Sequence, residues 1–317
     1  MIKHGYTIPK PPHGSQEWLN ARWQNEDGQA RITASVAAVV HNEHRFTTPA
    51  DLAVELLAKT PPVPKEQNDA MRRGTILEGP LMLWASEILN VTITEPQELF
   101  CYEEDGVRLM ATLDGKDLSG KIYELKTYNK RWNGQLPPYW KWQGVQQAIC
   151  ADANEITWIV FDSDLQLQFH TQTVTSDERQ QHIDAVRKFL GFIDMGMMPE
   201  GADPTYDNAS ALYPEGYENT VVLGHEVYNT LERLSIAKEQ IKSAEAVRDQ
   251  LQGELGMLLG DAEYGSIDGV QVITWKNSSR TSFDAKQFEK EHPALHAKFK
   301  KTSTFRTMRI TAKESKP

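Results

Sequence analysis

The chain is 317 residues long, 39% hydrophobic and 25% charged, with a formal net charge of −10 at pH 7. Its length is enough for a substantial core in one large domain or two, and its composition is that of an ordinary globular protein. The negative balance argues against indiscriminate binding to nucleic acid, which depends on neutralising phosphates, but it leaves room for a local basic channel.

The sequence shows no pattern typical of a membrane span, a secretory signal or a cysteine-based site. No apolar run approaches the roughly 20 residues that a membrane span needs, and the start, MIKHGYTIPKPPHGS, lacks the apolar stretch of a secretory signal. Two cysteines, Cys101 and Cys150, are too few for a disulfide framework or a four-cysteine metal site, and we interpret Cys150 as a buried free thiol. The nine histidines show no ligand spacing and are interpreted as incidental. A reducing, cytoplasmic compartment fits these features.

Helices are predicted along the first part of the chain. One begins at Ser15, and the next runs through TASVAAVV with Thr33 or Ser35 as its N-cap. Another follows Thr48 and has Pro49 in its first turn.

Beyond a proline-rich break at 61–64, helical and strand-like patterns alternate. A long helix is predicted from about Asn68 to Leu89, and further helices at 138–151 and 176–195. Runs rich in β-branched and aromatic residues predict strands at 91–94, 98–102, 107–113, 121–127, 156–162 and 165–173. This order of elements predicts an α/β layer domain, which we place at residues 1–200.

A loop rich in proline and glycine indicates a linker, placed at 201–219, before an extension at 220–317. Apolar residues of the extension recur at about 3.5-residue spacing: Val227, Leu231, Leu234, Ile241, Val247, Leu251, Leu255 and Leu258. They predict a helix, or a pair of helices, about 35 residues long in all. Two interpretations stay open, a subunit or partner contact and an intramolecular helical hairpin. A β-hairpin is predicted over 266–276.

The end of the extension is basic. Between Lys286 and Lys313 there are eight lysines and arginines against two glutamates, a local net charge of +6 in an acidic protein. This segment lines a path for DNA or is a solvated face.

The stretch MATLDGKDLSGKIYELKTYNK, Met110–Lys130, brings acids and a lysine together. Glu124 and Lys126 lie two apart on a predicted strand and therefore share one face. Asp114 ends the preceding strand, and a turn-rich connection returns the chain so that Asp114 meets Glu124. Two carboxylates on one face need a positive partner, and Mg²⁺ is held in proteins by one or two carboxylates plus waters and substrate phosphate.

Motifs on either side extend this pattern. Glu78 lies upstream in an otherwise apolar helical stretch, and Gln143 and Gln147 lie downstream at i, i+4 on one helical face. The motifs GSQEWLNAR, RITAS, RGTILE, ATLDG, YELKT and WQGVQQAI follow one another over residues 14–174. In this order the chain resembles the YqaJ-type viral recombinases, the family of phage lambda exonuclease, within the PD-(D/E)xK nuclease superfamily.

The resemblance implies a restriction-endonuclease-like core, a mixed central sheet flanked by helices. Beyond the resemblance, the residue patterns predict a C-terminal helical hairpin or coiled coil and a small β extension. The resemblance also implies a set of metal ligands: Asp114, Glu124, the carbonyl of Leu125 and, directly or through water, Glu78. Lys126 would act on the attacking water, and Gln143 would fix Lys126 or the scissile phosphate.

A pocket for a 5′-phosphate is implied as well. Its residues would be Arg22, Ser35, Thr112, Lys130 and Arg131. The spacer WQNEDGQA is longer than is usual in this family, so Arg31 is an alternative to Arg22.

The activity implied by the resemblance is a metal-dependent 5′-to-3′ exonuclease on double-stranded DNA ends. It would leave 3′ overhangs for phage-type homologous recombination, in a bacterial or phage-infected host cell. Mg²⁺ is the expected cofactor, with Mn²⁺ as the alternative, and the expected partners are DNA ends, a single-strand annealing protein and further copies in a ring of three or four. The alternative function is a DNA-end or annealing-protein binding module of the same fold with weak or no nuclease activity. Every acidic position of the motif is filled, which favours the enzyme.

Overall fold

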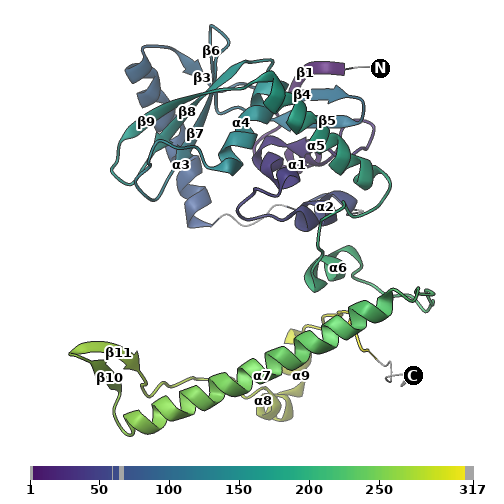
Figure 1. The fold of residues 1–317 in the computed structure, drawn as a ribbon, viewed down its shortest axis with the longest axis vertical. Helices are drawn as coiled ribbons and strands as arrows, with labels where there is room; N and C mark the ends of the chain where they lie inside the picture. Colours follow the sequence, from purple (N-terminus) through teal and green to yellow (C-terminus); the bar gives the residue numbers. More distant parts are fainter. Residues whose placement is uncertain (1–2, 59, 64–67, 311–317) are drawn as a thin grey trace. The chain divides into compact units, whose positions relative to one another are not determined.

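The computed structural model describes residues 3–58, 60–63 and 68–310. The chain folds into two compact units, Met1–Pro214 and Glu215–Pro317. The first unit contains two sheets with their covering helices, and the second contains one long helix, a two-stranded hairpin and two short helices, as Figure 1 shows.

The first unit is built around a five-stranded sheet in the order β3-β6-β7-β8-β9. Its strands are β3 (Ile93–Thr94), β6 (Gly115–Asp117), β7 (Ile122–Thr127), β8 (Glu155–Phe161) and β9 (Leu167–Thr173). β7 and β8 run parallel and the other neighbours are antiparallel. The predicted mixed central sheet is therefore confirmed.

A second sheet has the order β1-β4-β5-β2. Its strands are β1 (Lys3–Pro9), β4 (Glu98–Glu104), β5 (Val107–Ala111) and β2 (Ile32–Thr33), with β2 and β5 parallel. The helices of the unit are α1 (Gln16–Trp23), the 3-10 helix η1 (Ala34–His41), α2 (Pro49–Leu57), α3 (Asp69–Leu89), α4 (Pro138–Cys150), α5 (Ser176–Asp194) and α6 (Tyr206–Leu212). Buried residues of β5, β7, β8, α4 and α5 form one hydrophobic core.

The side chains on the two faces of β7 contact different helices. Successive side chains of a strand point to opposite faces. Tyr123 and Leu125 pack against α3, while Ile122 belongs to the core that includes α4. Glu124 and Lys126 share the face of Ile122, and they therefore point toward α4, where glutamine side chains meet them.

The segment that begins at Gly115 differs from the structure predicted from the sequence. The residues after Asp114 were predicted to form only a turn-rich connection, but Gly115 begins β6, a strand that pairs with β3 and β7. A Cβ atom at Gly115 would lie 2.4 Å from Cγ2 of Ile93 and 3.3 Å from Sδ of Met82. Glycine is needed here because β3 and α3 approach the strand closely.

The segment after Thr33 differs from the expected α-helix. It forms the 3-10 helix η1, and Thr33 at its N-cap makes no capping hydrogen bond. The Thr33 hydroxyl instead accepts from Arg22 Nη2 at 3.4 Å and lies 3.2 Å from Ser35 Oγ. The other predicted starts are confirmed, because Ser15 caps α1 and Thr48 forms a capping box with Asp51.

Gly144 in α4 provides a test of packing. A Cβ atom there would lie 2.5 Å from Gln172 Oε1 and 2.9 Å from Trp158 Cζ2. Gln172 Oε1 is held by a hydrogen bond of 3.0 Å from Trp158 Nε1, so it is not free to move away. We expect Gly144→Ala to lower the free energy of unfolding by about 1–3 kcal/mol, although alanine is the better helix former.

Gly191 in α5 is the matched control, because no atom lies within 4 Å of a Cβ built there. Gly191→Ala should raise the free energy of unfolding by about 0.5–1 kcal/mol. Urea denaturation followed by tryptophan fluorescence measures both values. If both substitutions stabilised the protein equally, the close packing of α4 on β8 would not exist.

The second unit contains α7 (Val227–Leu259), β10 (Tyr264–Ile267), β11 (Val270–Thr274), α8 (Ala285–Glu291) and α9 (Pro293–Phe299). α7 is one unbroken helix of 33 residues, the first of the two alternatives for the apolar repeat (Figure 1). The predicted hairpin is confirmed, with Asp268 and Gly269 at φ values of 49° and 78° in its turn. In the described part of the chain, no helix combines the length and apolar character that crossing a membrane requires.

Candidate active site

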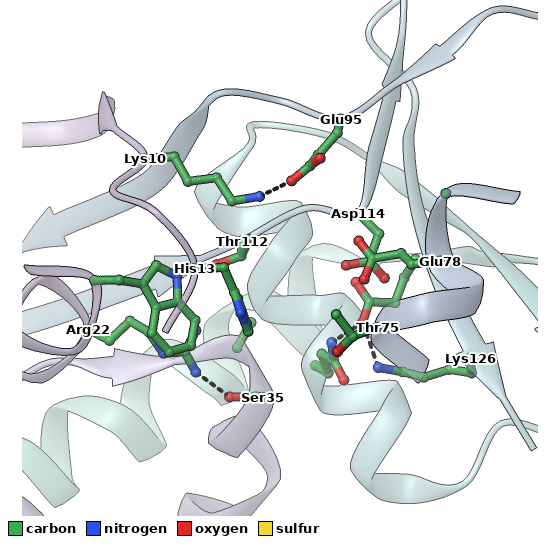
Figure 2. A pocket seen from close by; sticks show the side chains of 15 residues that line it. Lys10, His13, Arg22, Ser35, Thr75, Glu78, Glu95, Thr112, Asp114 and Lys126 are labelled. Carbon is green, nitrogen blue, oxygen red and sulfur yellow. Dashed lines mark hydrogen bonds and ion pairs between the residues drawn. The ribbon is translucent and has the colours of Figure 1, made fainter. Parts of the chain in front are cut away.

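A cavity of about 500 Å³ in the first unit gathers most of the predicted site residues. α1, η1, α3, α4 and the segments around β5 and β7 contribute to its walls, and Figure 2 shows the side chains that line it. The predicted residues among them are Arg22, Ser35, Glu78, Thr112, Asp114, Glu124, Lys126 and Gln143.

Asp114 is fixed by the backbone of the neighbouring strand. Its Oδ2 accepts a hydrogen bond of 2.9 Å from the backbone N–H of Leu125. This bond ties the segment after β5 to β7 and places Asp114 beside the strand that carries Glu124. Glu78 projects from α3 into the same side of the cavity, beside Asp114 in Figure 2.

Glu124 is the most enclosed carboxylate of the cavity, with 3% of its surface exposed. It accepts hydrogen bonds from Lys126 Nζ at 2.5 Å, Gln143 Nε2 at 2.5 Å and Gln147 Nε2 at 2.6 Å. Gln147 is fully buried and also donates to the carbonyl of Thr112 at 3.1 Å. Gln147, which the helical spacing placed on the face of Gln143, therefore supports the site by holding Glu124.

The carboxylates of this group destabilise one another's charged forms. Burial, followed by the charge of Glu124, raises the pKa of Asp114 well above its usual value. Burial, followed by the charges of Glu95 and Glu124, raises the pKa of Glu78. Burial alone would lower the pKa of Lys126, but Glu124 and Asp114 outweigh it and raise that pKa, so the ammonium stays charged. One ammonium beside three carboxylates leaves an excess of negative charge.

This excess fits a divalent cation bound by oxygen atoms. Among the described residues, no three carboxylate, imidazole or thiolate groups form a complete metal site. A complete protein cage is not what Mg²⁺ uses, because it is held by one or two carboxylates and keeps several waters or phosphate oxygens. Asp114 and Glu124 would supply those carboxylates, since a carboxylate has about four lone-pair positions and Glu124 keeps one beyond its three donors.

The opposite end of the cavity is basic and rich in hydroxyl groups. Arg22 Nη2 donates to Ser35 Oγ at 2.9 Å, and the guanidinium lies 4.3 Å from the ring centre of Trp18. Burial lowers the pKa of Arg22 to about 10, which still leaves it charged at pH 7. The Oγ1 of Thr112 is buried and has no hydrogen-bond partner within the described residues. These groups offer donors to an anion.

His13 and Lys10 also line the cavity, although neither was predicted as a site residue. The His13 ring lies 4.6 Å from that of Trp18, and burial, followed by the charge of Arg22, lowers the His13 pKa. Lys10 Nζ forms an ion pair of 2.5 Å with Glu95, across the cavity from Arg22 in Figure 2. No motif marked them because they reach the site through the pairing of β1 with β4.

Three predicted phosphate ligands lie outside this cavity. Arg31 is buried, with its guanidinium 3.6 Å from Cys101 Sγ and 3.5 Å from Glu103 Oε1. Lys130 and Arg131 are exposed because the backbone after β7 bonds to the β8–β9 turn, whose Asp164 pairs with Arg131 at 3.3 Å. Of the two arginines considered, Arg22 and the Arg31 that begins RITAS, Arg22 is the one that lines the cavity with the acids.

Two histidines interpreted as incidental form part of the support. His41 Nε2 lies 2.9 Å from His182 Nδ1, and His182 Nε2 lies 2.9 Å from Gln146 Oε1. Gln146 donates in turn to the carbonyls of Ile32 and Met110 at 2.8 and 2.9 Å. Burial lowers the pKa of His41 to about 4 and that of His182 to about 3, so both are neutral at pH 7. This chain of bonds ties η1, α4 and α5 to β2 and β5 beneath the cavity.

Residues 17–154 match the model of the YqaJ-like viral recombinase domain. The match confirms the resemblance seen in the motifs and covers every residue of the acid–lysine group. No curated protein matches the chain.

Several solved structures are similar at low identity. An alkaline exonuclease, LHK-Exo, from Laribacter hongkongensis is 20% identical with a TM-score of 0.46 over 57% of this chain and 93% of that one. A phage-related exonuclease from Haemophilus somnus 129PT is 12% identical with a TM-score of 0.38 over 51% and 94%. A putative exonuclease from Eubacterium rectale is 11% identical with a TM-score of 0.42 over 66% and 93%. Similarities this distant say nothing about activity.

Proposed function

We propose that the chain is a metal-dependent exonuclease. The match of residues 17–154 to the YqaJ-like viral recombinase domain supports this proposal. The enzyme would act on the ends of double-stranded DNA, digest the 5′-ended strand and leave a 3′ overhang. The observation that carries this proposal is that one cavity holds an acid–lysine group at one end and a half-buried arginine with hydroxyls at the other. Such a cavity suits two phosphates of one strand, a terminal one and the one to be cleaved.

The acid end suits the scissile phosphate. Asp114, Glu124 and the carbonyl of Leu125 would hold the metal, with Glu78 beside them directly or through water. A bound Mg²⁺, or Mn²⁺ in its place, lowers the pKa of water and stabilises negative charge on phosphate oxygens.

Lys126 and Gln143 would act on the reacting groups. The Lys126 ammonium, positioned by Glu124, orients the attacking water and stabilises charge as it develops at phosphorus. Gln143 is bonded to the same Glu124 oxygen and holds Lys126 or the phosphate in place. Water adds to phosphorus, the bond to the 3′ oxygen breaks, and that oxygen takes up a proton. The products are a 5′-mononucleotide and a strand with a new 5′-phosphate.

The basic end of the cavity would determine which DNA strand is digested. A terminal 5′-phosphate would accept hydrogen bonds from Arg22, Ser35 and Thr112, since charged donors to phosphate are the strongest of the common hydrogen bonds. A duplex end without that phosphate would lack the anchor that places the next phosphate beside Lys126.

The proposal also includes further copies of this chain and a protein partner. A ring of three or four subunits would keep the enzyme on DNA and would reconcile a net charge of −10 with a basic lumen. A single-strand annealing protein would take up the 3′ overhang.

The test compares blunt duplexes with 5′-phosphate and 5′-hydroxyl ends, each with Mg²⁺ and with EDTA. Acid-soluble nucleotides should be released from the phosphorylated duplex at least tenfold faster, and EDTA should stop release from both. DNA-end binding without nucleotide release in Mg²⁺ or Mn²⁺ would favour the binding module instead.

A further inference from the structure

The long helix α7 has an uncovered apolar side. None of its 33 residues is buried against the other described residues of the second unit. Its stripe of large apolar residues is 37–83% exposed, at Leu234, Ile241, Leu251, Leu255 and Leu258. At 1.5 Å per residue α7 is about 50 Å long, and a helix gains most of its stability by packing such a face.

The stripe follows a seven-residue repeat with two positions facing the same way. The first position is occupied by Val227, Leu234, Ile241, Arg248 and Leu255, and the second by Thr230, Ala237, Ala244, Leu251 and Leu258. Only Arg248 and Thr230 are polar in this set. A repeat of this kind over more than four heptads is the seam of a two-helix coiled coil.

We propose that α7 pairs antiparallel with α7 of a second copy of this chain. In an antiparallel pair each first-position residue meets a second-position residue of the other helix. Leu234 then packs on Leu251 of the second copy, and Ile241 packs on Ala244 of the second copy. The pair has two-fold symmetry, so each contact occurs twice.

Charges beside the seam favour this register. Residues that flank a seam form the ion pairs that set partner choice and orientation. In this register Arg233 faces Glu254 of the second copy, and Lys238 faces Glu245 of the second copy. Both pairs have opposite signs, and two-fold symmetry doubles them.

Other pairings of the same helices oppose like charges. A parallel pair in register would place Arg248 against Arg248 and Arg233 beside Lys238. Sliding the antiparallel pair by one heptad would place Glu245 against Glu245 or Lys238 against Lys238. In the proposed register Arg248 meets Ala237, whose small side chain leaves the arginine room to reach water.

A cysteine scan of the full-length chain tests the register with a short bis-maleimide. Ala244→Cys should crosslink into dimers, because the two cysteines would lie about 4.5 Å apart along the pair. Val227→Cys alone should not, because its two copies would be about 46 Å apart, whereas adding Leu258→Cys should restore crosslinking. The unmodified chain gives the background, since both native cysteines are buried. Dimers from Val227→Cys alone, or none from Ala244→Cys, would overturn the proposal.

Charge reversal tests the partner. In the Ala244→Cys background, Lys238→Glu should raise the protein concentration needed for half-maximal crosslinking about tenfold. Adding Glu245→Lys should return it to the starting value, since the pair regains opposite signs. Glu239→Lys, on the outer side of the helix, should change it little. Crosslinking reports on α7 alone, so a ring made by the nuclease units does not mask the result. A double variant as weak as Lys238→Glu would contradict the pairing.

Discussion

Replacing Lys126 with alanine is expected to lower the rate of nucleotide release from linear duplex by about 10²–10⁴-fold. The ammonium is the one cation in hydrogen-bond contact with the Glu124 carboxylate, at 2.5 Å, among the described residues. In the proposed reaction, the substitution removes the charged donor that orients the attacking water beside the scissile phosphate. Release of acid-soluble nucleotides under single-turnover conditions measures the effect on chemistry rather than on binding.

Lys130→Ala is the control for Lys126→Ala, because it removes the same charge from a residue outside the cavity. It should leave the rate within about twofold, as is usual for an exposed position. Both Lys126→Ala and Lys126→Met remove the ammonium from Glu124, but Lys126→Met keeps the aliphatic stem and serves as a second variant that leaves no cavity. If a folded Lys126→Met variant, checked by its unfolding midpoint, released nucleotides at the original rate, Lys126 would have no place at the reacting centre.

The acid–lysine group could be predicted because its geometry is local. The two-residue period of a strand places Glu124 and Lys126 on one face, and a hairpin of short length returns the chain to Asp114. The structure shows the same group, with Asp114 bonded to the backbone of Leu125. The glutamine face of α4 follows from helical spacing in the same way. Local periodicity therefore predicts which side chains share a face, whereas the meeting of Glu78 and the α4 glutamines with this group was implied by the family resemblance.

The rest of the site depends on contacts between distant segments. His13 and Lys10 enter the cavity only because β1 adds to the edge of β4, a pairing that the sequence of β1 does not reveal. Lys130 and Arg131 are adjacent to the site in sequence, but the loop after β7 turns toward the β8–β9 turn and carries them away. Nearness along the chain was a poor guide wherever a loop, rather than a strand or a helix, set the direction of the side chain.

Replacing Arg22 with glutamine is expected to reduce the preference for 5′-phosphorylated ends by about 10–100-fold, the worth of one hydrogen bond to a charged group. The rate on 5′-hydroxyl ends should change much less, because that substrate has no terminal phosphate for Arg22 to bind. The surroundings of Arg22 make it effective, since its half-buried guanidinium is held in place by Ser35 and Trp18 and lines the cavity. The ratio of kcat/KM on the two substrates measures the preference.

Arg131→Gln is the matched control, because it removes an arginine that the motifs assigned to the same pocket and the structure places at 82% side-chain exposure beside Asp164. Its ratio should equal that of the original chain. The two variants distinguish binding of the 5′-phosphate by Arg22 from general electrostatic attraction of DNA. Both remove one positive charge, but only Arg22 lines the cavity. An equal loss of preference in both variants would show that total charge, not the guanidinium in the cavity, selects the 5′-phosphate. An unchanged preference in Arg22→Gln would move the phosphate site to another part of the cavity, where Lys10 and His13 supply the remaining basic groups.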